Sequence, residues 1–271
     1  MLIRPLDVDR LKREFRAAQP YPHAMIDGFL DEDFAREVAG AYPTFEEADA
    51  LGFQFKAVNE NRKVQITESE KFPDPVQRLN DALASPELRA QLSEIAGIDD
   101  LEYDATLAGG GMHMTGARGR LDVHVDFNYL SELKIYRRLN LLVYLNPVWQ
   151  PQWGGGVEIW DREVQQRHAV FGPKLNRAVM FETSEHSFHG VEECTCPEDV
   201  SRNSFAVYYY TRTPAPGYAG VDHTTIFKAR PDEKLKKYVL MPAERAKGVL
   251  VEGKHKLRRA KERLEGLLDK D

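Results

Sequence analysis

The stretch LDVHVDFNY, residues 121–129, places a histidine and an aspartate two positions apart in a segment of alternating apolar residues. Such alternation is typical of a β-strand, in which residues i and i+2 point to the same face of the sheet. The imidazole of His124 and the carboxylate of Asp126 would then lie side by side and could bind one metal ion. A solvated strand face would show the same two residues, so the rest of the chain has to distinguish these interpretations.

The composition of the whole chain is that of a globular domain. It has 271 residues, of which 42% are hydrophobic and 30% charged, with a net charge of −6, so it can form a sizeable core and has no overall basic excess for nucleic acid. No apolar run approaches a membrane span, residues 1–10 lack the apolar region of a signal peptide, and Cys194 and Cys196 alone make no disulfide framework. We therefore expect a cytoplasmic protein that binds neither nucleic acid nor a membrane.

Secondary-structure signals divide the chain into three parts. Residues 1–100 carry several helical patterns, among them 85–97. Residues 101–213 carry about eight short strand-like segments separated by turn-forming stretches, which predicts a sandwich or jelly roll. Residues 214–271 form a helical extension, in which 254–271 have apolar residues at helical spacing. We expect one domain of mainly β structure with flanking helices, and the last helix could mediate a homodimer.

A third metal ligand would have to come from a distant strand that folds back beside the first. Non-haem Fe(II) oxygenases hold iron with two histidines and one carboxylate, and the open positions face the cosubstrate and O2. The segment FETSEHSFHGVEE, residues 181–193, carries two histidines. We favour His189 because HGV closes a strand-like segment, and we keep His186 as the alternative.

Arg202 and Ser204 open the next strand-like segment and share one face by alternation. A guanidinium fork beside a hydroxyl group can bind a carboxylate. An arginine at the start of a strand is unremarkable by itself. Here it follows a candidate His-Asp-His site, and a dicarboxylate cosubstrate of the metal would need such a partner.

Six motifs follow one another in order over about residues 101–213. They are His124-Val-Asp126, RRLNLLVYLN (137–146), WGGGVEIW (153–160), RAVMFET (177–183), HGV (189–191) and Arg202-x-Ser204 before FAVYYYT. This set resembles the Fe(II)/2-oxoglutarate-dependent dioxygenases, most closely the branch that contains prolyl hydroxylases. The resemblance implies a double-stranded β-helix, a cupin-like distorted jelly roll, with Fe(II) bound by His124, Asp126 and His189 at its open mouth.

The resemblance also implies contacts with the cosubstrates 2-oxoglutarate and O2, which bind at the iron. Arg202, Ser204 and Tyr144 would contact the distal carboxylate of 2-oxoglutarate. Asn140 lies four residues before Tyr144 and, by alternation, on the same face, so it would line that pocket. Met114, ten residues before the first histidine ligand, occupies a position where the family often places a side chain beside the cosubstrate.

The implied reaction is hydroxylation of an unactivated C–H bond with release of succinate and CO2. The segment FNYLSELKIYRR, residues 127–138, is expected to form a loop or lid at the mouth, where Arg137 and Arg138 either contact an anionic substrate or are merely solvated. His113 is expected to point away from the pocket. A compact barrel favours a small molecule or biosynthetic intermediate as substrate, and a prolyl or other protein residue is the alternative.

A function from another class is a catalytically silent, cupin-like barrel that only binds or senses a ligand. Such a protein would have little need of three metal ligands together with the cradle of Arg202 and Ser204. A cupin-type enzyme with another metal would use several histidines and a glutamate and would lack the arginine for a dicarboxylate. Arg202 is therefore the residue that separates these functions.

Overall fold

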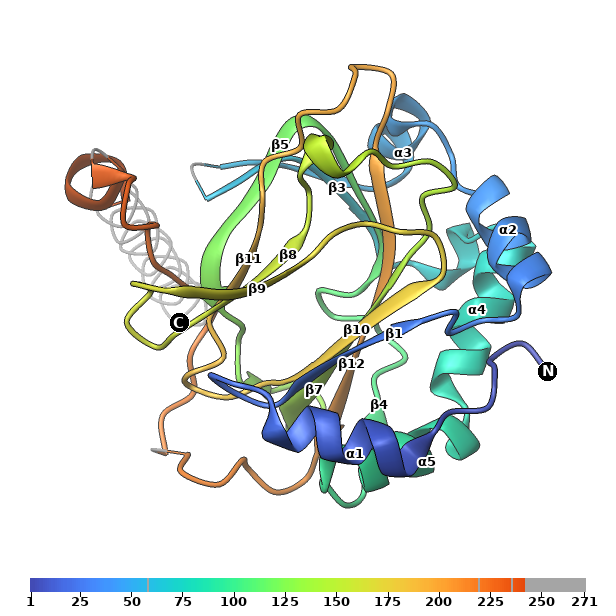
Figure 1. Ribbon diagram of the computed structural model, residues 1–271, viewed down its shortest axis with the longest axis vertical. Coiled ribbons are helices and arrows are strands. Elements are labelled where there is room, and N and C mark those ends of the chain that lie inside the picture. The colour runs from blue at the N-terminus through green and yellow to red at the C-terminus, as the bar shows by residue number, and fades with distance from the viewer. Residues whose placement is uncertain (58, 219, 235, 242–271) are drawn as a thin grey trace, which may run out of the picture. The chain divides into compact units, whose positions relative to one another are not determined.

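The computed structural model describes residues 1–57, 59–218, 220–234 and 236–241 (Figure 1). The chain divides into two compact units, Met1–Lys228 and Ala229–Asp271. In the second unit the described residues form one short π-helix, η3 (Lys236–Leu240). The helix predicted over 254–271, and the homodimer contact expected there, lie outside the described residues. Every helix in the described part of the chain is too short or too polar to cross a membrane.

Four of the five α-helices described in the first hundred residues begin after a residue whose side chain caps them. α5 (Pro86–Ala96) starts after Ser85, whose side chain accepts a hydrogen bond from the backbone of Leu88, and it ends at Gly97 in the left-handed conformation. This agrees with the helix predicted over 85–97. The other helical elements are α1 (Val8–Ala17), α2 (Glu32–Gly40), α3 (Phe45–Leu51), η1 (Ser69–Lys71), α4 (Asp74–Ala84) and η2 (Pro151–Trp153).

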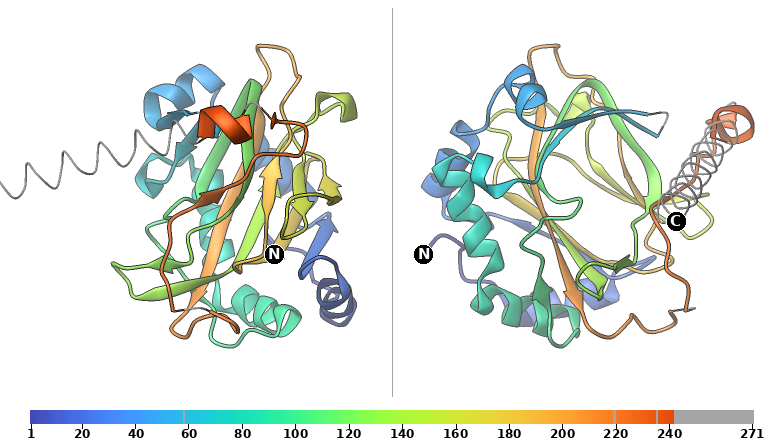
Figure 2. Two further views of the ribbon diagram at one scale, coloured as in Figure 1. Left: turned by 90° about the vertical axis from the view of Figure 1, so that its left-hand side faces the viewer. Right: turned by 180° about the vertical axis from the view of Figure 1, so that it is seen from behind.

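Antiparallel strands form a nearly closed barrel, which confirms the predicted double-stranded β-helix (Figures 1 and 2). The main path of the sheet runs β1-β10-β7-β12-β5-β11-β8-β9, and the remaining strands pair at its sides. In chain order the strands are β1 (His23–Asp27), β2 (Phe53–Lys56), β3 (Glu60–Ile66), β4 (Glu102–Tyr103), β5 (Gly111–Val125), β6 (Tyr129–Leu130), β7 (Ile135–Tyr144), β8 (Val157–Trp160), β9 (Arg167–Phe171), β10 (Arg177–Glu182), β11 (His189–Val191), β12 (Arg202–Thr211) and β13 (Ile226–Phe227).

The long strand β5 connects the two halves of the barrel. Its first half pairs with β3 and β12, and its last residues pair with β11 and β13. Against β11, His189 pairs with His124 and Val191 pairs with Leu121, so three residues of β11 face four of β5. This bulge reverses the alternation of β5 between Leu121 and His124. Counting back from His124 in steps of two therefore predicts the wrong face for the residues of β5 that precede the bulge.

The helices cover the outer face of the sheet, and the inner face encloses the candidate site. On β7, Leu141 and Val143 point outward into a core shared with the helices, for example with Leu79 of α4. Leu142 and Tyr144 point inward and pack with residues of β8 and β10. Both faces of the sheet are thus buried, and only the inner one can line a cavity in the barrel.

The first hundred residues, which the sequence predicted to be mostly helical, also contribute three strands. β1 pairs with β10, and β2 and β3 form a hairpin that pairs with β5. Of β3, only its last residues, 64–66, are buried. β2 is only four residues long, and β3 begins with a polar run, residues 60–63, so neither segment shows a long alternation of apolar and polar residues.

Candidate active site

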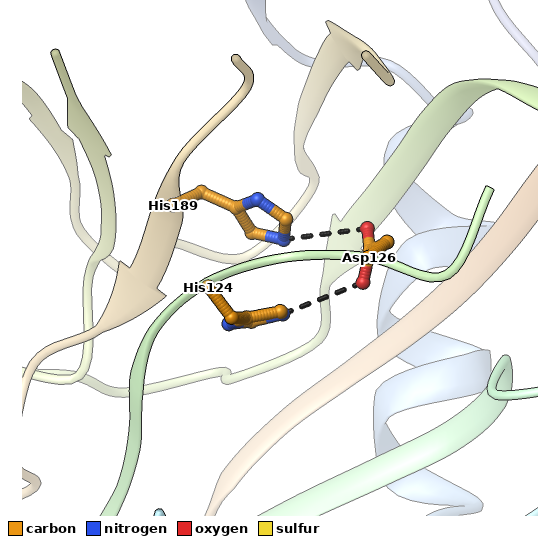
Figure 3. A group of neighbouring side chains, drawn as sticks. All are labelled: His124, Asp126 and His189. Carbon is orange, nitrogen blue, oxygen red and sulfur yellow. Dashed lines mark ion pairs between the residues drawn. The ribbon is translucent and has the colours of Figure 1, made fainter. Parts of the chain in front are cut away.

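Three side chains from two neighbouring strands converge at one end of the barrel (Figure 3). His124 lies on β5, Asp126 directly follows it, and His189 begins β11. His124 Nε2 lies 3.3 Å from Asp126 Oδ1, and His189 Nε2 lies 3.5 Å from Asp126 Oδ2. One ligand atom from each residue lies within 4.8 Å of the others. This spacing is suited to a single metal ion held by two imidazoles and one carboxylate.

Backbone carbonyls fix the orientation of both imidazole rings. His124 Nδ1 lies 2.8 Å from the carbonyl oxygen of Asp122, and His189 Nδ1 lies 2.9 Å from that of Ser187. A carbonyl oxygen only accepts, so each Nδ1 carries the hydrogen. The lone pairs of the Nε2 atoms then point towards the carboxylate of Asp126. Two lone pairs and a carboxylate that face one another repel. A divalent cation bound among the three groups would remove this repulsion.

The electrostatic environment keeps Asp126 and His189 in the protonation states that a metal needs. Burial lowers the pKa of His189 to about 4, and the neighbouring His124 adds to the effect. Burial by itself would raise the pKa of Asp126, but the charge of Arg137 and the two imidazoles outweigh it and hold this pKa well below its usual range. A neutral imidazole and an ionised carboxylate are the ligand forms of these residues. The residues present therefore fit Fe(II).

The structure distinguishes the two histidines of the segment 181–193. His189 is buried beside His124, whereas His186 is exposed on the loop between β10 and β11. The start of β11 explains this difference. His189 is the first residue of β11 and pairs with His124 of β5, whereas His186 lies three residues before the strand begins.

The three converging residues open onto a cavity of about 330 Å³ inside the barrel. Its walls come from β3, β5, β7, β8, β10, β11 and β12. Near His124 and Asp126 the wall includes Phe127, Arg137, Asn140 and Tyr208. Further along the same strands it includes Lys63, Gln65, His113, Thr115 and Arg202.

Arg202 supplies a buried positive charge to this second end of the cavity. Its Nε donates to the carbonyl oxygen of Gly155 at 2.7 Å, and its Nη1 donates to Ser204 Oγ at 3.1 Å. No ion pair involves Arg202 among the residues that the structure describes. A guanidinium group has five N–H donors, so several remain for a ligand. A buried cation without an acidic partner is suited to an anionic ligand.

Tyr144 departs from the predicted contact with the cosubstrate. Its hydroxyl donates to the carbonyl oxygen of Phe171 at 2.7 Å and accepts from the backbone N–H of Val157 at 3.1 Å. The hydroxyl has one hydrogen, which is already used, and the side chain is not part of the cavity wall. The ring instead packs against the Arg202 guanidinium, whose carbon lies 4.8 Å from the ring centroid. Tyr144 thus links β7 to β8 and β9 and supports Arg202.

Met114 and His113 have exchanged the places that alternation predicted for them. Met114 points away from the cavity into the core beneath the helices, whereas His113 lines the cavity. The bulge in β5 is the reason, because it lies between these residues and His124. His113 Nε2 is 3.1 Å from the carbonyl oxygen of Gly109, and burial holds the pKa of this imidazole well below its usual value.

The segment predicted as a lid is instead a tight hairpin of β6 and β7, in which Tyr129 pairs with Tyr136. Arg137 and Arg138 are consequently buried strand residues and not solvated loop residues. Arg137 Nη2 lies 3.0 Å from Asp126 Oδ2. The sequence offered a signal for this in RRLNLLVYLN, where an apolar strand begins directly after two arginines.

The segment after β12 closes part of the mouth. β13 pairs with the end of β5, and the ring of Phe227 lies 5.3 Å from the ring of His124. Asn128, Glu185 and His223 connect three separate segments here, because Asn128 donates to Glu185 at 3.0 Å and His223 Nε2 lies 2.8 Å from the same carboxylate. No sequence pattern indicates this contact, which joins residues almost a hundred positions apart.

Comparison with known proteins agrees with this geometry. The fold and the His-Asp-His cluster are those expected of a non-haem Fe(II) oxygenase, and residues 110–210 match the family model of the 2OG-Fe(II) oxygenase superfamily. The chain is 29% identical over 204 residues to the mouse (Mus musculus) protein Prolyl 3-hydroxylase OGFOD1, which covers 72% of this chain. It spans about a third, 34%, of that relative's length.

Two solved structures share the fold at low identity. A prolyl hydroxylase from Trichoplax adhaerens, solved with a peptide fragment of hypoxia inducible factor, has a TM-score of 0.52 and 17% identity, and the match covers 75% of this chain and 90% of that one. The carbocyclase SnoK of nogalamycin biosynthesis has a TM-score of 0.53 and 14% identity, with 85% and 92% covered.

The matched part of the chain, residues 110–210, is therefore similar to the 2OG-Fe(II) oxygenase superfamily, and the chain resembles a prolyl hydroxylase over a longer range.

Proposed function

We propose that this protein is a 2-oxoglutarate-dependent dioxygenase that uses Fe(II), 2-oxoglutarate and O2 to hydroxylate a C–H bond of a prolyl residue in a polypeptide. One molecule each of 2-oxoglutarate and O2 would be consumed, one oxygen atom would enter the C–H bond, and the other would leave in succinate together with CO2. The observation that carries the proposal is that a convergent His-Asp-His cluster and a buried arginine, which has no acidic partner among the described residues, face one cavity.

We assign His124, Asp126 and His189 as the iron ligands. The iron, when bound, supplies the redox chemistry that activates O2. Arg202 would bind the distal carboxylate of 2-oxoglutarate through its free N–H groups, and Ser204 holds the guanidinium in place from the next inward position of β12.

The size of the cavity limits the part of the substrate that reaches the metal. A volume of about 330 Å³ is at the low end for small-molecule sites, which span roughly 300–1,000 Å³. The cosubstrate would occupy a large part of it. The remaining space suits a residue-sized group, while the rest of a polypeptide could lie outside the barrel.

The relatives move our preference from a small molecule to a protein residue. The mouse protein is named a prolyl 3-hydroxylase, and the Trichoplax adhaerens enzyme was solved with a peptide fragment. A free amino acid or another small biosynthetic intermediate is the second candidate, because the remaining volume accepts such a molecule as readily as a side chain. A cytoplasmic location, homodimerisation and the lack of nucleic-acid and membrane partners stay predictions from the sequence.

Succinate release tests these candidates directly. The enzyme would be supplied with Fe(II), 2-oxoglutarate and O2, and with a pool of synthetic peptides that have a central proline. The control pool has alanine at that position, and free amino acids form a third set. We expect succinate above background only with the proline pool, and mass spectrometry should find one added oxygen on that proline. Turnover with free amino acids alone would contradict the peptide assignment.

A further inference from the structure

The two carboxylate oxygens of Asp126 have different surroundings. Oδ2 accepts a hydrogen bond from Asn140 Nδ2 at 2.7 Å and lies 3.0 Å from Arg137 Nη2. Oδ1 lies 3.3 Å from His124 Nε2, and Oδ2 also lies 3.5 Å from His189 Nε2. Both oxygens therefore face the histidines, and Asn140 and Arg137 both contact Oδ2.

The orientation of the Asn140 amide is fixed by its neighbours. Its Oδ1 accepts from Arg137 Nε at 2.9 Å and from Thr183 Oγ1 at 3.1 Å. The arginine can only donate, so the oxygen of the amide must face it, and the NH2 group must face Asp126. The residues involved are all buried, so water does not compete for these bonds.

Two aromatic rings hold the guanidinium of Arg137 in place. Its central carbon lies 3.3 Å from the ring centroid of Tyr208 and 4.8 Å from that of Phe127. Contacts of this kind favour a cation above the ring face. These contacts restrict the movement of the Arg137 guanidinium away from Asp126, although Phe127 and Tyr208 themselves line the cavity.

We propose that Asn140 and Arg137 are positioning residues that hold Asp126 Oδ2 and so fix the orientation of the carboxylate beside His124 and His189. This inference rests on the proposed metal site. It also changes the role that the sequence suggested for Asn140, from a contact with the cosubstrate to a support of a metal ligand. A carboxylate whose orientation is fixed in this way needs little rearrangement to bind a metal ion.

The first test measures the affinity for Co(II) by calorimetry without any turnover. Groups that orient metal ligands typically change metal affinity by about 10- to 100-fold when they are replaced. We expect a loss of this size in Asn140→Leu, which keeps the approximate volume and removes the hydrogen bonds.

The matched control is Asn146→Leu. Asn146 is as buried as Asn140, follows the same strand, and also makes two hydrogen bonds, with the carbonyl oxygen of Ser201 and the backbone N–H of Asn203. It lies outside the cavity wall, so its replacement should affect folding stability and not Co(II) affinity.

A second set of variants tests the same network without removing Asn140. Arg137→Lys keeps the charge and loses the fork that contacts both Asp126 and Asn140, so it should also weaken Co(II) binding. Arg138→Lys is its control, because Arg138 bonds to Thr211 and not to this network. Thr183→Val removes one of the two donors to Asn140 and should have a smaller effect. These variants decide the question if Asn140→Leu does not fold.

The outcomes separate this inference from the proposed function. If wild-type protein does not bind Co(II), the metal site itself is wrong. If the wild type binds Co(II), and Asn140→Leu and Arg137→Lys bind it within about twofold of their controls, the positioning role is overturned and the metal site stands. Both Asn140→Leu and Arg137→Lys should bind Co(II) more weakly than the wild type. If the variant that carries both changes loses less binding free energy than the sum of the two single losses, the two residues act in one connected network.

Discussion

The metal end and the arginine end of the cavity differ in how their charges are balanced. At the metal end the carboxylate of Asp126 lies beside Arg137 and between two imidazoles. At the other end Arg202 is equally buried, but its polar contacts in the described part of the chain are a backbone carbonyl and the hydroxyl of Ser204, while the ring of Tyr144 packs against the guanidinium. Protein groups therefore organise the first end, while the second has a charge that a ligand must balance.

This difference indicates what each end contributes to binding. An organised set of ligands costs little rearrangement when a metal arrives. A buried cation without a partner is unfavourable until an anion pairs with it, so it gives specificity for an acidic ligand. The following variants test this difference between the metal end and the arginine end of the cavity.

The largest effect is expected for His189→Ala, which removes one of three metal ligands. Co(II) binding measured by calorimetry should be lost. His186→Ala is the matched control from the loop that precedes His189, and it should bind Co(II) as the wild type does. Loss in the control and retention in His189→Ala would reverse the choice between the two histidines.

Arg202→Met should damage the other end alone. Hydrogen bonds to charged groups contribute roughly 1.5–3 kcal/mol, which corresponds to a rise of about 10- to 100-fold in the KM for 2-oxoglutarate. Co(II) affinity should stay close to that of the wild type, because Arg202 contacts none of the three metal ligands. Initial rates of succinate formation at varied 2-oxoglutarate provide the measurement. An unchanged KM would contradict the assignment of Arg202.

Tyr144→Phe tests whether this tyrosine supports the fold or contacts the cosubstrate. The hydroxyl bonds to two backbone groups, of Val157 and Phe171, and its removal should lower the free energy of unfolding by about 1–3 kcal/mol. Urea unfolding measures that loss. The KM for 2-oxoglutarate should change little. A rise comparable to that in Arg202→Met would restore the direct contact that the sequence predicted.

The smallest effect concerns acid pH and His113, at the arginine end. Burial and the nearby charges of Lys63 and Arg202 lower its pKa well below 6.5, so the folded state holds this imidazole neutral. The unfolded chain then binds the extra proton first as the pH falls below about 6.5, and folding stability decreases. In His113→Gln the melting temperature should depend less on pH between 7 and 5 than in the wild type. Identical pH profiles would exclude this contribution.

The two ends also differ in how well the sequence predicted them. His124 and Asp126 sit two residues apart with no bulge between them, so alternation placed both correctly, and Arg202 and Ser204 follow the same rule. Met114 was misplaced because a bulge separates it from His124, and sequence patterns do not reveal bulges.

Other departures arise from partners distant in the chain. The predicted role of Tyr144 was wrong about its hydroxyl because its partners, Val157 and Phe171, lie on other strands. The position of Arg137 beside Asp126 depends on how the hairpin of β6 and β7 returns to the end of β5. The fold class was predictable because it requires only the order and spacing of strands, whereas these contacts depend on register and packing.

The most direct test of the whole account is an anaerobic titration of the wild-type protein with Fe(II) and then 2-oxoglutarate, followed by visible absorbance. We predict a metal-to-ligand charge-transfer band that appears only when both are present and that is absent in His189→Ala. A wild-type protein that gives no such band under these conditions would contradict the claim that this cavity holds iron and 2-oxoglutarate together.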